Sequence, residues 1–413
     1  MKPLARLSVV VLLGLGAVVV PGHATATIRT CADPAAPLTV EEERLALAAP
    51  TEILLRSGFD RFAQDFIPSL CKLRDAAAAE RAFRAQGRQL WQAATARAQG
   101  RQVLGDLPLT DDRPLYWARL QLTKAVRQWT PSFELGDAER AELLATLESS
   151  SRGQDTIRFS GSMKRIVLTG FDPFLLDTSI RRSNPSGATA LALDGTVVRT
   201  AAGLARIETA VFPVLWDPFA RGVVEQTLLP HLGTVDMFAT VSQGRPNRFD
   251  VEGFNGRWRG GFPDNNNVSS TGVIPIPEGV PTVEPAPEFV ATTLPSAAII
   301  AADTGRFAVF ANTSVREIPA GETDPVTSPD GPTPGSVARE GSGGDYLSNE
   351  IAYRATLLRD ALGLDIPGGH LHTPVLQFGD GNTTELTDPT FEANLRDIVD
   401  QMRAILVVAA ETL

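Results

Sequence analysis

The sequence predicts a three-layer α/β domain that follows a small all-α domain. Up to residue 150, apolar residues recur at spacings of three, four and seven, which is the period of one helix face. Beyond residue 163, short β-branched runs alternate with helical stretches, as expected for a sheet covered by helices on both faces. We therefore assign 27–150 to the helical domain, 151–162 to a linker and 163–413 to the α/β domain.

The first 26 residues have the pattern of a secretory signal peptide. Lys2 and Arg6 precede an apolar run from Leu7 to Val20, and the small residues Ala24-Thr25-Ala26 fit a cleavage site. The run is shorter than the roughly 20 residues that span a bilayer. We therefore expect cleavage near Ala26 and a secreted, extracellular protein with no membrane attachment; an uncleaved anchor is the alternative.

The charge and the cysteine content argue against some classes of function. The 413 residues include 38 Lys and Arg and 48 Asp and Glu, a net charge of −10, which argues against a nucleic-acid partner. The only cysteines are Cys31 and Cys71, which we expect to form a disulfide in an exported protein; two free thiols are the alternative. No cysteine follows Lys72, so the α/β domain has no thiol with which to attack a substrate.

Two helices stand out in the helical domain. Leu73, Phe83 and Leu90 fall on one face of the first, and Pro114 has the position of an early helical residue in the second. This region contains no recognisable cluster of catalytic residues. We expect it to pack against the α/β domain or to assist its folding.

Five runs predict strands of the α/β domain: Arg165–Thr169, Ala205–Phe212, Met237–Val241, Phe307–Ala311 and Pro374–Phe378. A closing helix is predicted where Asp388 and Pro389, a cap and a first helical residue, precede an apolar stripe. Residues 321–344 are rich in Pro, Gly, Ser and Thr and predict a long surface loop. This loop precedes a candidate site residue, so it is either a lid or a passive insertion.

Several segments of the α/β domain carry recognisable motifs in a fixed order. They are Gly170-Phe171-Asp172-Pro173-Phe174, Asn184-Pro185-Ser186, Gln243-Gly244-Arg245 followed by Glu252, Gly344-Asp345-Tyr346-Leu347-Ser348-Asn349, and Gly369-His370-Leu371-His372-Thr373-Pro374. Over 164–384 this order resembles the pyroglutamyl peptidase family, cysteine exopeptidases that remove an N-terminal 5-oxoproline. The resemblance implies the three-layer fold of that family, with a mixed sheet.

The resemblance also implies roles for the catalytic residues. His372 matches the general base, and Glu252 matches the acidic residue that orients it. Ser348 occupies the position of the family's nucleophilic cysteine. Because a serine hydroxyl must lose its proton to a base during attack, Ser348 is either a nucleophile in an adapted triad or a helix cap in an inactive site.

The same resemblance implies a substrate pocket. Phe171 and Phe174 provide flat apolar faces that suit a small lactam ring, and Gln243 joins them in substrate binding. Two positions depart from the family: Leu175-Leu176 replaces Gly-Gly, and Gly261 stands where the family has an arginine.

Two functions are consistent with these residues. The first is a secreted peptidase that hydrolyses an N-terminal pyroglutamyl amide bond; the alternative is an inactive homologue that binds a peptide terminus or a small lactam-like ligand. His370 and His372 would share one face of a strand, which raises the alternative of a metal site, but the sequence indicates no third ligand. We therefore expect no metal and no cofactor.

Overall fold

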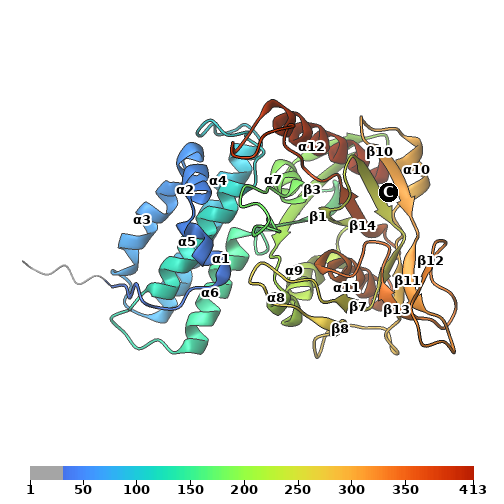
Figure 1. Ribbon diagram of the computed structural model, residues 1–413, viewed down its shortest axis with the longest axis horizontal. Helices are drawn as coiled ribbons and strands as arrows, with labels where there is room; N and C mark the ends of the chain where they lie inside the picture. The colour runs from blue at the N-terminus through green and yellow to red at the C-terminus, as the bar shows by residue number, and fades with distance from the viewer. Residues whose placement is uncertain (1–30) are drawn as a thin grey trace, which may run out of the picture. The chain divides into compact units, whose positions relative to one another are not determined.

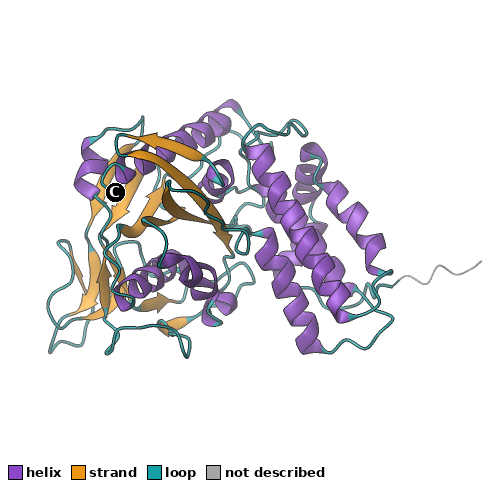
Figure 2. Cartoon of the chain, turned by 180° about the vertical axis from the view of Figure 1, so that it is seen from behind, coloured by secondary structure: helices purple, strands orange, loops and turns teal. Residues whose placement is uncertain are grey.

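The computed structural model describes residues 31–413, which form one compact unit. The predicted signal peptide, residues 1–26, lies outside the described residues. No helix in this described part of the chain is both long enough and apolar enough to cross a membrane. The described chain begins with helices, and its first strand starts at Lys164. Figure 2 shows one group of helices that contains no strands, and the strands gathered in the rest of the molecule.

Helices make up the region before the first long strand. They are α1 (Val40–Glu43), the 3₁₀ turn η1 (Arg44–Ala46), α2 (Ala48–Ser57), α3 (Asp60–Leu70), α4 (Ala76–Ala98), α5 (Arg113–Gln128) and α6 (Asp137–Ser151). Cys31 and Cys71 form a disulfide that joins the start of the described chain to the end of α3. The covalent link therefore lies within the helical region.

The helical region has an aromatic core that continues into the α/β region. Phe83 of α4 packs edge-on against Trp129, with ring centroids 5.8 Å apart, and Trp117 of α5 is fully buried in the same core. The same apolar cluster includes Leu191 and Val211 from the α/β region. The division at 150–163 stays a prediction, but the two regions share this core.

A seven-stranded mixed sheet forms the centre of the α/β region. Its strand order is β10 (Ala308–Asn312), β5 (Arg248–Glu252), β14 (Gly368–Thr373), β4 (Met237–Gln243), β1 (Lys164–Phe171), β3 (Gly203–Phe212) and β2 (Val197–Thr200). The four strands from β14 to β3 run parallel, whereas β5 is antiparallel to β14 and β2 to β3. Because β5 and β14 are neighbours in the sheet, residues that are far apart in the sequence lie close together at the ends of these two strands.

Helices cover both faces of this sheet. One face packs against α7 (Pro185–Leu193), α10 (Ser296–Ala301) and α12 (Pro389–Ala410), and the other against α8 (Trp216–Ala220), α9 (Val223–Leu232) and α11 (Leu347–Ala361). Successive side chains of β1 point to opposite faces of the sheet and so enter two different hydrophobic cores. Ile166 and Leu168 face the first group of helices, and Val167 faces the second. Figure 1 shows the three layers. The predicted three-layer α/β fold with a mixed sheet is confirmed.

One predicted strand is wrong. Pro374–Phe378 contains no strand; the chain instead forms β14 immediately before it, at Gly368–Thr373. Pro374 has no N–H to donate to a neighbouring strand, which explains why the ladder stops at this point. Two glycines and two histidines give β14 little intrinsic strand preference, so its place in the sheet comes from burial between β4 and β5.

The predicted loop at 321–344 also contains structure. Within it, β12 (Val326–Ser328) and β13 (Val337–Glu340) pair with opposite edges of β11 (Val315–Ile318) in a three-stranded antiparallel sheet. Two further two-stranded sheets join β6 (Phe254–Gly256) to β9 (Phe289–Ala291), and β7 (Trp258–Gly260) to β8 (Thr271–Val273). The segment is therefore a small sheet with connecting turns, and its last strand leads directly toward α11.

Candidate active site

A buried carboxylate and an imidazole form the most ordered part of the site. Glu252 is the last residue of β5, and His372 lies near the end of the neighbouring strand β14. The His372 Nδ1 atom is 2.7 Å from Glu252 Oε1, while Glu252 Oε2 accepts a hydrogen bond from Asn312 Nδ2 at 2.9 Å. With Nδ1–H donated to the carboxylate, His372 Nε2 carries the free lone pair that a general base requires.

Two glycines allow this imidazole to occupy its position. A Cβ atom on Gly244 would lie 2.6 Å from the His372 Cβ atom, and one on Gly343 would lie 3.2 Å from His372 Cε1. Any side chain at Gly244 would therefore displace the ring, and one at Gly343 would press against it. The close approach of these two backbones holds His372 against Glu252.

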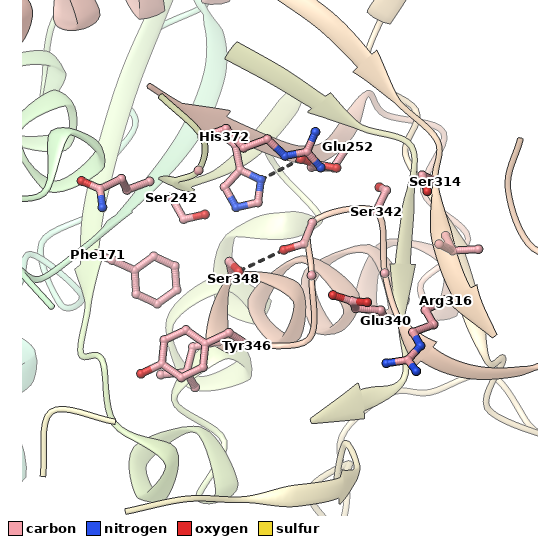
Figure 3. A pocket seen from close by; sticks show the side chains of 18 of the residues that line it. Phe171, Ser242, Glu252, Ser314, Arg316, Glu340, Ser342, Tyr346, Ser348 and His372 are labelled. Carbon is pink, nitrogen blue, oxygen red and sulfur yellow. Dashed lines mark hydrogen bonds and ion pairs between the residues drawn. The ribbon is translucent and has the colours of Figure 1, made fainter. Parts of the chain in front are cut away.

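Ser348 is the second residue of α11 and is half-buried. Its hydroxyl donates a hydrogen bond to the Gly343 carbonyl oxygen at 3.3 Å (Figure 3). Tyr346 occupies the cap position of α11, so Ser348 is not the cap of this helix. Among the described residues no hydrogen bond joins Ser348 to His372, although both line one pocket.

The start of α11 favours negative charge in the part of the pocket near Ser348. Backbone amides in the first turn of a helix have no carbonyl partner within that helix, and the helix dipole makes this end positive. A negatively charged oxygen that forms near Ser348 is therefore favoured at this end of the 15-residue helix.

One pocket of about 390 Å³ brings the candidate residues together. Glu252, Ser348, His372, Phe171, Phe174 and Gln243 all line it, and residues from β11 to β13 close another side, including Arg316 and Glu340. Burial, reinforced by Asp345, raises the pKa of Glu340. The small sheet at 315–340 is thus part of the pocket wall, whether or not it moves as a lid.

The aromatic wall of the pocket is held by hydrogen bonds to its backbone. Asn184 Nδ2 donates to the Asp172 carbonyl at 2.9 Å, and Asn265 Nδ2 donates to the Pro173 carbonyl at 2.9 Å. Leu175 follows with a φ of 59°, a left-handed conformation that glycine adopts without strain. The turn from Phe171 to Phe174 therefore keeps a glycine-like backbone although leucine occupies position 175.

Residues of the helical region also fix this turn, a role that the sequence did not reveal. Arg152 and Arg119 both contact the Asp172 carboxylate, and Glu41 accepts a hydrogen bond from Asn265 Nδ2 at 3.0 Å. Helical arginines usually extend into solvent, so their spacing alone gave no signal. In the folded chain Arg119 and Arg152 are buried behind the pocket wall.

The segment around Gly261, where the pyroglutamyl peptidase family has an arginine, does not line the pocket. Gly261 has a φ of 89° and lies beside Thr271. Arg259, two residues earlier, is buried and donates to both carboxylate oxygens of Glu350 at 2.6 Å. Arg259 therefore stabilises the first turn of α11 and does not line the pocket.

Comparison with known proteins identifies the family. Two family models match: the PA0049 N-terminal domain over residues 23–148, and the PA0049 C-terminal domain over residues 165–286 and 308–377. The Pseudomonas aeruginosa protein PA0049, described as uncharacterized, is 35% identical over 460 residues, covering 86% of this chain and 83% of that protein. The chain belongs to the PA0049 family. The two PA0049 models account for the helical region and for most of the α/β region.

Solved structures that resemble this PA0049-family chain include pyrrolidone carboxyl peptidases. A mutant enzyme from Pyrococcus furiosus is 22% identical, with a TM-score of 0.42, over 60% of this chain and 99% of that chain. The enzyme from Thermococcus litoralis is 19% identical, with a TM-score of 0.38, over 59% of this chain and 94% of that chain.

Proposed function

We propose that this protein hydrolyses the amide bond that follows an N-terminal pyroglutamyl residue. The observation that carries the proposal is the 2.7 Å contact between Glu252 and His372 in the pocket that Ser348 also lines. A protein that only binds a ligand has no need of an imidazole oriented by a buried carboxylate in a pocket that also presents a hydroxyl. The motif order in the α/β region supports pyroglutamyl chemistry in particular.

In this proposal Ser348 is the nucleophile. Its hydroxyl rotates away from the Gly343 carbonyl, transfers its proton to His372 Nε2 and forms a bond from Oγ to the substrate carbonyl carbon. The developing oxyanion accepts hydrogen bonds from first-turn amides of α11. His372 then protonates the leaving amine as its bond to carbon breaks, which leaves a pyroglutamyl ester on Ser348.

The second half of the reaction reverses these roles. Water loses a proton to His372 and attacks the ester carbonyl, and the released Ser348 oxygen takes the proton back from His372. Glu252 keeps its hydrogen bond to Nδ1 in both halves and stabilises the protonated imidazole. The products are free pyroglutamate and a peptide that is one residue shorter.

Substrate and location form part of the same proposal. Phe171 and Phe174 supply apolar faces for the lactam ring, and Gln243 contributes polar contacts from the end of β4. The signal peptide predicted at residues 1–26 would direct this activity to peptides outside the cell.

One observation favours a second candidate function. In the structure the Ser348 hydroxyl donates to Gly343 and not to His372, an arrangement that also suits a non-catalytic protein which binds a lactam or a peptide terminus. Nucleophile and base are often further apart in the absence of substrate, so the same geometry is also compatible with the peptidase function.

A fluorogenic pyroglutamyl amide separates the two candidates. The wild-type protein is expected to release the fluorophore, and Ser348→Ala to slow release by roughly 10³-fold or more. Ser269→Ala, at an exposed serine outside the pocket, is the matched control and is expected to keep the wild-type rate. Absence of turnover in a folded wild-type protein that still binds pyroglutamate would support the binding function instead.

A further inference from the structure

A second histidine, which does not itself line the pocket, forms a hydrogen bond with a hydroxyl that does. His370 is fully buried in β14; its Nε2 atom is 2.8 Å from Ser242 Oγ, and its Nδ1 atom is 2.8 Å from Thr240 Oγ1. The parallel pairing of β4 with β14 sets this arrangement, because it places His370 beside Thr240 and His372 beside Ser242. Ser242 lines the same pocket as Ser348 and lies next to His372 in Figure 3.

The hydrogen-bond partners assign the protons in this chain of groups. Thr240 Oγ1 is 3.2 Å from the Gly369 carbonyl, which can only accept. If Thr240 donates to Gly369, His370 Nδ1–H donates to Thr240 and the Ser242 hydroxyl donates to His370 Nε2. This assignment satisfies three donors, whereas the opposite tautomer leaves the contact between Thr240 and Gly369 unused.

The assignment determines what Ser242 presents to a ligand. Its single proton points to His370, so only oxygen lone pairs face the pocket. His370 is badly placed to remove that proton during a reaction, because burial and the neighbouring His372 both lower the pKa of His370 well below its usual value. No carboxylate among the described residues contacts His370 as Glu252 contacts His372, so Ser242 is a fixed acceptor and not a second nucleophile.

We propose that Ser242 accepts a hydrogen bond from an N–H group of the ligand, and that His370 is a positioning residue that holds Ser242 in the acceptor orientation. The choice of ligand rests on the proposed function, in which the N–H group is that of the lactam ring. Ser242 makes the pocket selective for a lactam over a carbocyclic ring of the same shape. Loss of one such bond in a buried site corresponds to about a 10- to 100-fold loss in affinity.

Two ligands and two variants test this proposal by calorimetry. The ligands are pyroglutamide and its carba analogue, in which CH₂ replaces the ring N–H; the full-length protein carries Ser348→Ala so that no hydrolysis occurs. We expect pyroglutamide to bind about 10- to 100-fold more tightly than the analogue, and this ratio to fall to near one when Ser242→Ala is added. Ser269→Ala is the control and is expected to keep the ratio.

A second variant tests the positioning role of His370. Thr240→Val removes the acceptor of His370 Nδ1–H, so the imidazole is expected to take the other tautomer and donate from Nε2 to Ser242. The Ser242 proton then points into the pocket and the preference for the lactam is lost, although Ser242 itself is unchanged. A purely structural role for Thr240 would lower both affinities and keep their ratio.

The possible failures are distinguishable. If both ligands bind and the Ser242→Ala substitution leaves the ratio of their affinities unchanged, the inference about Ser242 is overturned and the proposed function stands. If neither ligand binds to a folded protein, the lactam pocket is overturned together with the proposed function.

Discussion

Arg152 donates two hydrogen bonds to one oxygen of Asp172, from Nε at 3.0 Å and from the second guanidinium nitrogen at 2.9 Å. Arg119 lies 2.6 Å from the other oxygen of the same carboxylate. All three side chains are buried, and Asp172 belongs to the turn between Phe171 and Phe174 that walls the pocket. The helical region therefore holds one wall of the candidate site through a buried charge cluster.

Replacing Arg152 tests this link. Burial and the neighbouring Arg119 lower the pKa of Arg152 to about 10, so Arg152 remains protonated at pH 7. Arg152→Met leaves Asp172 with only one cationic partner and is expected to reduce the free energy of unfolding by about 3 kcal/mol. Urea denaturation measures this loss, and the KM for a pyroglutamyl amide is expected to rise because the turn loosens.

A matched control separates this link from a general loss of positive charge. Arg88 is partly exposed and pairs with Asp155 at 3.1 Å, so Arg88→Met is expected to cost no more than about 1 kcal/mol and to leave KM unchanged. An equal effect of both substitutions would show that the Asp172 cluster has no special role.

The buried carboxyl group of Asp112 predicts an unusual pH dependence of the free energy of unfolding. Burial raises the pKa of Asp112 to about 8, although Ser183 and Asn184 donate hydrogen bonds to it. From about pH 4 to pH 8 the folded chain keeps a proton that the unfolded chain has released, so the contribution of Asp112 to stability falls as the pH rises. The expected slope approaches 1.4 kcal/mol per pH unit, on the order set by one proton.

Denaturation by urea at pH 5.5 and pH 7.5 tests this dependence. Asp112→Asn is expected to reduce the difference in the free energy of unfolding between the two pH values, since an amide does not titrate. Asp65→Asn, at an exposed position in α3, serves as the control and is expected to leave the change as in wild type. A wild-type slope in Asp112→Asn would contradict the account.

Glu252→Gln tests the orientation of the base. The amide keeps the shape of the side chain but no longer stabilises a protonated His372, so kcat is expected to fall by roughly 10²- to 10⁴-fold with little change in KM. Glu322→Gln, at an exposed position outside the pocket, is expected to have no effect on either constant. A small effect of Glu252→Gln would mean that the carboxylate only stabilises the fold.

Ser348→Cys tests how well the site is adapted to serine. A thiol at the start of α11 is expected to ionise readily there, because the helix N-terminus and His372 both favour the thiolate. We expect faster hydrolysis of a pyroglutamyl amide than in wild type at pH 7. A slower rate would indicate that the pocket has adapted to a serine nucleophile.

The sequence predicted the parts of the fold that depend on long apolar patterns. β1, β3, β4 and the helix that starts at Pro389 all match, because each carries a run of buried β-branched or periodic apolar residues. β14 was misplaced by several residues, since Gly368, Gly369 and His370 have little strand preference and are fixed by their neighbours. The strands within 321–344 were missed for a related reason, because they are only three and four residues long.

For the candidate site, the sequence predicted which residues are involved but not how their side chains are arranged. The motif order named Glu252, Ser348 and His372, and the structure places all three around one pocket. Rotamers and buried charges were not predictable from residue types: the Ser348 bond to Gly343 depends on a side-chain torsion, and the Arg152 contact with Asp172 depends on how two regions pack.

Covalent capture of the acyl-enzyme tests the central claim most directly. A pyroglutamyl ester with a good leaving group is mixed with the wild-type protein, the reaction is stopped with acid, and proteolytic fragments are analysed by mass spectrometry. The account predicts a pyroglutamyl group on the fragment that contains Ser348, and none in Ser348→Ala. Ester cleavage that leaves Ser348 unmodified, or a pyroglutamyl group on Ser242 instead, would contradict it.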